Sequence, residues 1–357
     1  MRILVIAVNP DLPESHLLVG LHRRGFELRV LCHPNAPHVN LFDQAGLPWE
    51  PFEIRGRFDP KAIRVIRRVL RRDAIDLVHT LMNAPLANAI WAAVGTQIPI
   101  IAYRGVVGNI QWWNPASRLT YLHPRVAKIA CVCDAIVADL KKQGVAPDRL
   151  MRIYKGHDVN WYAAATREEL CQTFDIPRDA WIVAGAAAMR PRKGTAVLLK
   201  AAAQVETAAR PVHYLLLGEV RDEEVERVEW PGDLRSRVHF TGFRADATRW
   251  TGAADVFVLP TLRREGLPKA VIEAMAQGVP AIVTRAGGSP ELVRHEVDGL
   301  VVPPGDAIAL ASGLNYLLAE PTKRRAWGAS AQRRIAKDFN ISTTIDAYAR
   351  LYVEVTS

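Results

Sequence analysis

Two carboxylates eight positions apart frame the most informative stretch of the chain, Glu265-Gly-Leu-Pro-Lys-Ala-Val-Ile-Glu273. Proline has no N–H to leave unpaired at the first position of a helix, so Pro268 predicts a helix over Pro268–Gln277. Glu265 then lies in the loop before this helix, and Glu273 lies inside it. The spacing therefore predicts one carboxylate at the helix start and a second one deeper along the helix.

A helix start of this kind can hold an anion. Backbone N–H groups near Gly266 and Leu267 would point out of the helix, where negative charge is stabilised. Lys269 lies one turn before Glu273 on the same face. A diphosphate on the helix end, with hydroxyls on the two acids, is the chemistry of a sugar nucleotide.

A second candidate is the basic loop Met189-Arg-Pro-Arg-Lys-Gly194, which follows an apolar run. The guanidinium groups of Arg190 and Arg192 and the ammonium of Lys193 suit a diphosphate leaving group. Positive charge there would stabilise the charge that develops as the sugar–phosphate bond breaks. From the composition alone, a solvated basic loop is the simpler interpretation. The position of the loop between a strand and a helix favours a role in binding the diphosphate.

A third candidate is Arg285-Ala-Gly-Gly-Ser-Pro-Glu291. Ser289, Pro290 and Glu291 are typical of a helix start and need no ligand to explain them. The two adjacent glycines are not required by that explanation. They would let the backbone approach a ligand or a facing domain closely. Both interpretations stay open.

The loop Tyr103–Asn114 follows a predicted strand and is rich in aromatic residues. Arg104, at the strand's carboxyl end, is a candidate catalytic cation. Trp112 and Trp113 could stack on a sugar ring, dip into a membrane interface or simply pack under the loop. With His79 and His16, they are our candidates for the acceptor side, although a lone histidine is more often structural.

Basic residues are concentrated in the first half of the chain. Residues 1–158 hold 21 Lys/Arg against 13 Asp/Glu, or +8 of the total +9. Within them, Lys61–Arg72 alternates arginines with an apolar stripe, a pattern typical of a membrane-surface helix and equally of a packed helix with a solvated face. We favour the solvated face for the helix alone. The excess charge keeps contact with an anionic membrane open, and no aromatic–basic RNA-binding signature is present.

Several chemistries are excluded or disfavoured by what the sequence lacks. It has no Ser/His/Asp arrangement, no HExxH, no Walker lysine loop and no GxGxxG, so a dinucleotide dehydrogenase is not expected. The four cysteines show neither a CxxC pair nor metal spacing with histidine, which favours a reduced, cytoplasmic protein and no metal site. The apolar start reads as a buried strand rather than a signal peptide, and no run is long enough to span a bilayer.

Strand-like and helix-like runs alternate along all 357 residues, which indicates parallel α/β sheets in two domains. The predicted strands are Ile3–Val8, Glu27–Cys32, Leu77–His79, Ile98–Ala102, Lys128–Val132, Leu150–Ile153, Trp181–Ala187, Val212–Leu217, Val238–Phe240, Val256–Leu259, Pro280–Thr284 and Gly299–Val302. The other predicted helices are Ser15–Arg24, Pro85–Ala93, Ser117–Leu122, Ala135–Gln143, Thr195–Glu206, Ala245–Ala253, Pro290–Arg294 and Ala307–Leu318. An irregular Lys155–Arg178 would join a domain of residues 1–158 to one of residues 159–342, each doubly wound and nucleotide-binding in type.

These residues resemble the family 4 glycosyltransferases. The motifs most specific to this resemblance are the Glu265-x7-Glu273 pattern and the run Glu273-Ala-Met-Ala-Gln-Gly-Val-Pro280. Supporting matches are Arg192-Lys-Gly194, Gly287-Gly-Ser-Pro-Glu-Leu-Val293, Asp298-Gly-Leu-Val-Val-Pro-Pro-Gly305, Gly156-His-Asp-Val-Asn160 and Asp76-Leu-Val-His79.

The resemblance implies a GT-B fold, with two Rossmann-like domains facing each other across a cleft and a final helix, 343–355, on the first domain. It implies that Glu273 holds ribose hydroxyls, Glu265 contacts the donor sugar, and Arg192 with Lys193 clamps the diphosphate. The turn at Phe243 and Arg244 would contact the base, and Gly266 to Lys269 would complete the donor site. It further implies retention of anomeric configuration without a metal or other cofactor.

The chain departs from the family pattern at three places. Asn9-Pro-Asp-Leu-Pro13 stands where many members have Gly-Gly, Tyr103-Arg104 where many have a histidine, and Ala188 where many have an arginine that Arg190 or Arg192 could replace.

From the resemblance we expect a retaining transferase that moves a sugar from a nucleoside diphosphate to a glycan or lipid-linked acceptor in cell-surface polysaccharide or lipopolysaccharide synthesis. It would be cytoplasmic, with possible peripheral contact with the inner face of the cell membrane. The alternatives are an epimerase or hydrolase on the same fold, or a non-catalytic sugar-nucleotide-binding protein.

Overall fold

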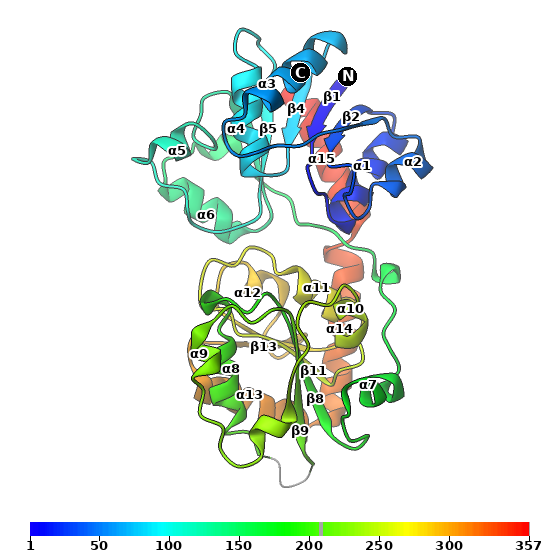
Figure 1. Cartoon of the computed structure of the whole chain (residues 1–357), viewed down its shortest axis with the longest axis vertical. Helices are drawn as coiled ribbons and strands as arrows, with labels where there is room; N and C mark the ends of the chain where they lie inside the picture. Colours follow the sequence, from blue (N-terminus) through cyan, green and yellow to red (C-terminus); the bar gives the residue numbers. More distant parts are fainter. Residues whose placement is uncertain (207–209, 357) are drawn as a thin grey trace. The chain divides into compact units, whose positions relative to one another are not determined.

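The computed structural model describes residues 1–206 and 210–356, which form two compact units. The first unit is Met1–Gly156 together with Phe339–Ser357, and the second is His157–Asp338. The chain thus leaves the first unit once and returns to it for the last helix (Figure 1).

The first unit is built on a seven-stranded parallel sheet with strand order β3-β2-β1-β4-β5-β6-β7. Its strands are apolar and largely buried, as expected for a parallel sheet covered on both faces. They are β1 (Arg2–Ile6), β2 (Glu27–Cys32), β3 (Trp49–Pro51), β4 (Leu77–Thr80), β5 (Ile100–Arg104), β6 (Val126–Cys131) and β7 (Leu150–Arg152). The helices are α1 (Leu12–Arg23), α2 (Asn40–Ala45), α3 (Pro60–Arg72), α4 (Asn83–Ala92), α5 (Pro115–Arg118), α6 (Asp134–Lys142) and α15 (Ile341–Thr356).

The second unit contains a six-stranded parallel sheet with order β10-β9-β8-β11-β12-β13. The strands are β8 (Trp181–Ala186), β9 (Val212–Leu217), β10 (Val238–Phe240), β11 (Val256–Leu259), β12 (Ala281–Thr284) and β13 (Gly299–Val302). The helices are α7 (Arg167–Phe174), α8 (Thr195–Ala202), α9 (Glu223–Glu226), α10 (Ala247–Thr251), α11 (Lys269–Ala276), α12 (Ser289–Leu292), α13 (Ala307–Ala319) and α14 (Pro321–Asp338). Both sheets are doubly wound, as the alternation of runs predicted.

The helix α15 completes the first unit. It packs along α1, where Gly20 leaves room for the side chain of Ile345: a Cβ at Gly20 would lie 2.3 Å from Ile345 Cδ1. On the same face of α15, Tyr348 and Tyr352 lie against His79 of β4. The C-terminal segment is therefore part of the core of the N-terminal unit.

Some elements differ from the prediction. The segment expected to be an irregular linker contains α7, whose N-terminus is closed by a capping box between Thr166 and Glu169. The 18-residue α14 was not predicted, because its buried side includes Arg324, Gly328 and Ala331, which give little apolar periodicity. Pro268 caps α11 rather than starting it. No helix among the described residues combines the length and the apolar character needed to cross a bilayer.

Candidate active site

A pocket of about 340 Å³ opens beside the carboxyl ends of β8 and β9 in the second unit. Ligands of doubly wound sheets bind at this edge. Its walls come from the loops after β8 and β9, the turn after β10 and the first turns of α10 and α11. The lining residues are Ala186, Ala187, Ala188, Leu217, Gly218, Glu219, Arg221, Phe243, Arg244, Ala247, Lys269, Ala270 and Glu273.

Glycine shapes one wall of this pocket. Gly218 has φ +137°, and a Cβ there would lie 2.0 Å from the carbonyl oxygen of Ala187. The Gly218 N–H donates to the carbonyl of Gly242 at 2.8 Å. The three loops are thus pressed together by backbone contacts that a side chain would prevent.

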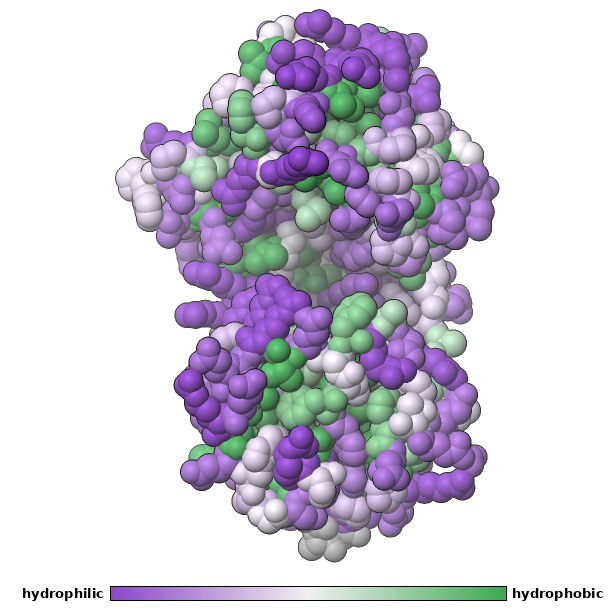
Figure 2. Space-filling model, viewed as in Figure 1, coloured by the Kyte–Doolittle hydropathy of each residue, from purple (hydrophilic) through white to green (hydrophobic). Residues whose placement is uncertain are grey.

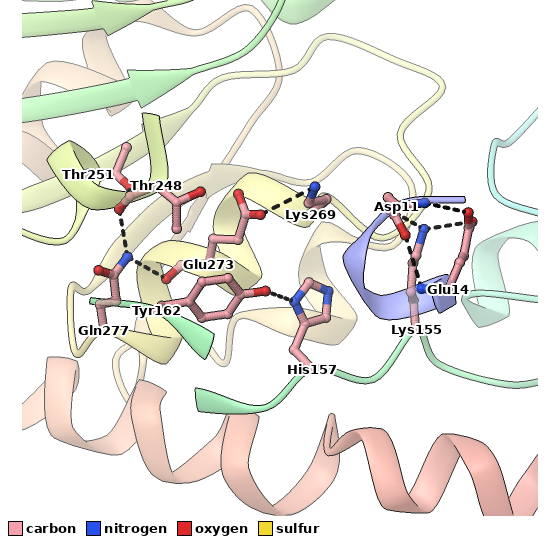
Figure 3. Close-up of polar contacts among 10 residues, drawn as sticks. All are labelled: Asp11, Glu14, Lys155, His157, Tyr162, Thr248, Thr251, Lys269, Glu273 and Gln277. Carbon is pink, nitrogen blue, oxygen red and sulfur yellow. Dashed lines mark hydrogen bonds and ion pairs between the residues drawn. The ribbon is translucent and has the colours of Figure 1, made fainter. Parts of the chain in front are cut away.

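Glu273 enters the pocket from α11. Its Oε1 lies 3.5 Å from Lys269 Nζ, one turn earlier, as the sequence spacing predicted (Figure 3). The amide of Gln277 donates to the Glu273 carbonyl at 3.1 Å and to the Thr248 carbonyl at 2.8 Å, which fixes the end of α11 against α10. A rigid helix therefore presents this carboxylate, with a lysine beside it.

Glu265 and Lys193 form a second charged pair. Lys193 Nζ donates to Glu265 Oε2 at 2.6 Å, and the hydroxyl of Thr261 donates to the same oxygen at 2.8 Å. The Glu265 residue is buried and the lysine is mostly so. The pair joins the loop after β8 to the loop before α11, so two segments predicted separately meet here.

The double glycine of residues 287 and 288 supports Glu265. Gly287 has φ +56°, and a Cβ there would lie 1.8 Å from the carbonyl oxygen of Glu265. The Gly288 N–H donates to the carbonyl of Gly266 at 3.0 Å. The close approach left open by the sequence is thus made to the backbone of the Glu265 loop.

Replacing Gly287 with alanine is expected to lower the free energy of unfolding by about 2 kcal/mol more than the same change at Gly305. Both glycines have positive φ, at +56° and +78°, but the space around Gly305 is open to 4 Å. The strain of a left-handed alanine is common to both, so the difference isolates the clash with Glu265. Chemical denaturation of the two variants measures it. Equal losses would mean that the loop shifts aside freely.

The remaining donor-side candidates lie around the pair. Arg192 holds the loop before α11: its carbonyl accepts the Leu262 N–H at 2.8 Å and its Nη1 lies 3.5 Å from the Arg264 carbonyl. Arg190 is exposed. Gly266, Leu267 and Pro268 form the turn into α11 and are not among the pocket's lining residues.

The turn after β10 places Phe243 and Arg244 at the pocket. Phe243 is 76% exposed. The guanidinium of Arg244 donates to both oxygens of Asp246, at 2.8 Å each, and this hydrogen bonding lowers the pKa of Asp246 to about 2. Because the Arg244 side chain is engaged within the turn, its backbone and the ring of Phe243 are the groups left to meet a ligand.

The first-unit candidates are placed differently from what we expected. Arg104 is buried, donates to the Gly108 carbonyl and lies 4.9 Å over the ring of Tyr121, so its guanidinium supports the loop after β5. His79 is fully buried, with Nδ1 2.8 Å from the hydroxyl of Tyr352. Burial lowers its pKa to about 3. Both are interior residues of this unit, and neither presents its ring or guanidinium at a surface.

The other acceptor-side candidates are at least partly exposed. Trp112 and Trp113 project from the loop between β5 and α5, where the Trp112 carbonyl accepts a hydrogen bond from Arg118 Nε at 2.8 Å. His16 lies partly exposed in α1.

A charged cluster at the start of α1 was not predicted. Lys155 Nζ donates to Asp11 Oδ2 at 2.7 Å and to Glu14 Oε1 at 2.8 Å, while Asp11 and Glu14 close a capping box on α1 (Figure 3). The capping pattern is visible in the sequence, but its lysine partner lies more than 140 positions away. Thr261, Glu219 and Arg221 are further site residues that we did not predict. No cluster of three or more potential metal ligands occurs in residues 1–206 and 210–356.

Comparison with known families covers both units. A family model described as Glycosyltransferase Family 4 matches residues 15–161, and one described as Glycosyl transferases group 1 matches residues 180–320. The chain belongs to the family 4 glycosyltransferases. It is an enzyme of that family with the two-domain GT-B fold, as the motifs of the second domain predicted.

Relatives of this glycosyltransferase are named for lipopolysaccharide core biosynthesis and for transfer of mannose to phosphatidyl-myo-inositol. A phosphatidyl-myo-inositol mannosyltransferase of Mycolicibacterium smegmatis is 27% identical over 100% of the chain and 94% of its own length. A lipopolysaccharide core biosynthesis glycosyltransferase of Rhizobium meliloti is 32% identical, but the match spans only about half of each chain, 49% and 50%.

Solved structures share the fold of the family 4 chain. Anabaena HepE in complex with UDP has a TM-score of 0.80 at 21% identity, covering 99% of this chain and 100% of that one. A glycosyltransferase from Rickettsia africae has a TM-score of 0.82 at 18% identity, covering 99% and 98%.

Proposed function

We propose that this glycosyltransferase moves a sugar from a nucleoside diphosphate to a lipid-linked or glycan acceptor in lipopolysaccharide, polysaccharide or glycolipid synthesis, with retention of anomeric configuration. The observation that carries the proposal is the pocket lined by Glu273 at α11, together with the Lys193–Glu265 pair that joins the loop after β8 to the loop before α11. The names of the relatives support the acceptor class.

The donor would be held by its nucleotide. Glu273 would accept hydrogen bonds from two ribose hydroxyls, since an ionised carboxylate is an acceptor with two oxygens. The ring of Phe243 and the backbone of Arg244 would meet the base. Lys269 and the N-terminal turn of α11 would attract the diphosphate, because helix starts and lysine both favour anions.

Lys193 would stabilise the leaving diphosphate in the chemical step. As the sugar–phosphate bond breaks, the departing diphosphate gains negative charge, and a pre-positioned cation stabilises that charge. Lys193 is held in place by Glu265, whose carboxylate oxygen also accepts a hydrogen bond from the hydroxyl of Thr261. Glu265 would hold the donor sugar. We assign no covalent nucleophile, and we expect transfer without an added metal because Lys193, Arg192 and Lys269 supply positive charge.

The experiment begins with a thermal-shift panel of UDP-, GDP-, ADP- and TDP-sugars. The correct donor at a hundred times its Kd should stabilise the folded state by about 2.7 kcal/mol. That donor is then incubated with and without lipid extract, and the anomeric configuration of the product is read by NMR. Retention in an acceptor-dependent product supports the proposal. An epimerised donor, acceptor-independent hydrolysis, or binding with no turnover would support the alternatives instead.

A lipid-linked acceptor would bring the enzyme to a membrane surface. We therefore also propose a cytoplasmic enzyme with peripheral contact with the inner face of the cell membrane. The +8 charge of residues 1–158 supports this, because the anionic lipids of that surface attract basic segments. Co-sedimentation with anionic and neutral vesicles tests it, and equal pelleting with both would argue against an electrostatic contact.

A further inference from the structure

Positive charge in the first unit is concentrated in one short segment. Residues 55–72, which lead into and form α3, hold eight Lys/Arg and one Asp. They account for +7 of the chain's net charge of +9. Figure 2 shows a hydrophilic surface over the part of the first unit where α3 lies.

The arginines of α3 form an exposed face. Lys61, Arg64, Arg68 and Arg71 recur at spacings of three and four, which places them on one side of the helix. All four are exposed, and the opposite side is buried through Ala62, Ile66, Val69 and Leu70. The helix therefore packs with one side and presents the basic side outward.

The charge of this face is not neutralised within the protein. Among the described residues, no carboxylate lies within ion-pairing distance of Lys61, Arg64, Arg68 or Arg71, whereas Arg72 at the helix end pairs with Asp73 and Glu50. Asp59, the one acid of the segment, caps the start of α3 by accepting the N–H groups of Lys61 and Ala62.

Apolar side chains lie beside this basic face. Phe58, Trp91 and Val94 are 63%, 40% and 56% exposed. The rings of Phe58 and Trp91 meet edge to face, with centroids 5.8 Å apart and planes at 81°. Arg67 ties α3 to the end of α4 through hydrogen bonds to the Trp91 and Ala92 carbonyls at 3.0 and 3.2 Å.

The aromatic pair is held rigidly. Asn88 of α4 is fully buried and donates to the Gly56 carbonyl at 2.9 Å, and it accepts the Asp59 N–H at 2.8 Å. The loop that carries Phe58 is thus fixed on α4, next to Trp91. The exposure of these rings is therefore built into the packing and does not depend on a loose loop.

We infer that the exposed face of α3, with Phe58, Trp91 and Val94, is the surface on which this enzyme docks to an anionic phospholipid bilayer. The arginines would bind lipid phosphates, and the apolar group would enter the interfacial layer, where tryptophan and phenylalanine side chains are favoured. The inference rests on the proposed membrane contact and assigns it to particular residues.

A nucleic acid is the other anionic partner to weigh. Proteins that hold single strands present ring faces on which successive bases stack. Here the edge-to-face packing of Phe58 and Trp91, with Val94 in the turn after α4, forms a compact apolar group instead. The surface therefore suits a bilayer better.

Vesicle co-sedimentation of the full chain tests the assignment. We expect binding to vesicles of equal parts phosphatidylcholine and phosphatidylglycerol, little binding to phosphatidylcholine alone, and weaker binding at high salt. The variant R64E/R68E should bind the anionic vesicles at least about twentyfold more weakly. The variant R325E/R333E carries the same charge change on exposed positions of α14 and should bind like the wild type.

A second pair of variants tests the apolar contribution. F58S/W91S should bind anionic vesicles more weakly than the wild type, whereas I308S, a change at an exposed apolar residue of the second unit, should not. Donor binding should be unchanged in all four variants, because none of these residues lines the donor pocket, and it also reports that each variant is folded.

The outcomes distinguish the assignment of the docking surface from the proposed membrane contact itself. If the wild type binds anionic vesicles and both R64E/R68E and F58S/W91S bind equally well, the surface is wrong and the membrane contact stands. If the wild type binds no vesicles, both the assigned surface and the proposed membrane contact are wrong. Retention of a single-stranded oligonucleotide that R64E/R68E loses, with no vesicle binding, would assign the surface to nucleic acid and overturn the inference.

Discussion

Replacing Lys193 with methionine is expected to lower kcat for sugar transfer by about a hundred- to a thousandfold, the usual effect of removing one group that stabilises transition-state charge. Methionine keeps the length of the side chain and removes only the ammonium. Because the charge matters most as the sugar–phosphate bond breaks, we expect a smaller change in donor affinity than in kcat. Initial rates at saturating donor, with donor Kd measured in parallel, separate the two.

The ion pair with Glu265 complicates this prediction. Removing Lys193 leaves a buried carboxylate with Thr261 as its recorded partner, and such a group destabilises its surroundings. The variant K193M/E265Q removes that charge. Because Glu265 itself would hold the donor sugar, the reference for this double variant is E265Q. If the loss of rate came only from the unpaired carboxylate, K193M/E265Q would match E265Q, and we expect it to be slower.

Two further variants of lysine complete the test. K193R keeps the positive charge and should retain part of the activity. K200M changes an exposed lysine of α8 in the same unit and should behave like the wild type. Wild-type turnover by K193M would remove Lys193 from the mechanism.

Replacing Glu273 with alanine is expected to weaken binding of the donor and of its free nucleoside diphosphate by about a hundredfold or more, because two hydrogen bonds to a charged group are lost. The carboxylate comes from a helix whose end is fixed by Gln277, so its position does not depend on the ligand. Isothermal titration with the nucleoside diphosphate measures the effect directly.

A sharper test compares binding of the nucleotide with binding of its 2′-deoxy form, which lacks one of the ribose hydroxyls that Glu273 would hold. The wild type should discriminate against the 2′-deoxy nucleotide, while E273A should bind the two nucleotides equally. E226A, a change at an exposed glutamate of α9 in the same unit, serves as the control. Undiminished discrimination in E273A would place the ribose elsewhere in the pocket.

Much of the fold follows from local sequence. The strands Glu27–Cys32, Val212–Leu217 and Val256–Leu259 have the predicted bounds because each is a short run rich in apolar, β-branched and leucine residues. The helix α14 was not predicted because three of its four buried positions hold an arginine, a glycine and an alanine, and the burial of these residues depends on what packs there. Local pattern cannot report that partner.

The candidate site divides in the same way. The Glu-x7-Glu spacing placed Glu265 before a helix and Glu273 within it. Their partners are of different kinds: Lys269 lies one turn away and could be predicted, whereas Lys193 lies 72 positions from Glu265 and meets it only through the sheet. His79 was misplaced for a related reason, since the helix that buries it comes from the other end of the chain.

The return of the chain to its first unit has a consequence for biosynthesis. Residues 157–338 are in effect inserted into the first unit, which cannot be completed until α15 has left the ribosome. At about 5–20 residues per second this delay is about ten to forty seconds. During that time the inserted unit is synthesised, and β4 and α1 lack the cover of Ile345, Tyr348 and Tyr352. We therefore expect the first unit of this enzyme to be completed last, and we expect a chain truncated before α15 to leave that unit open to aggregation and proteolysis.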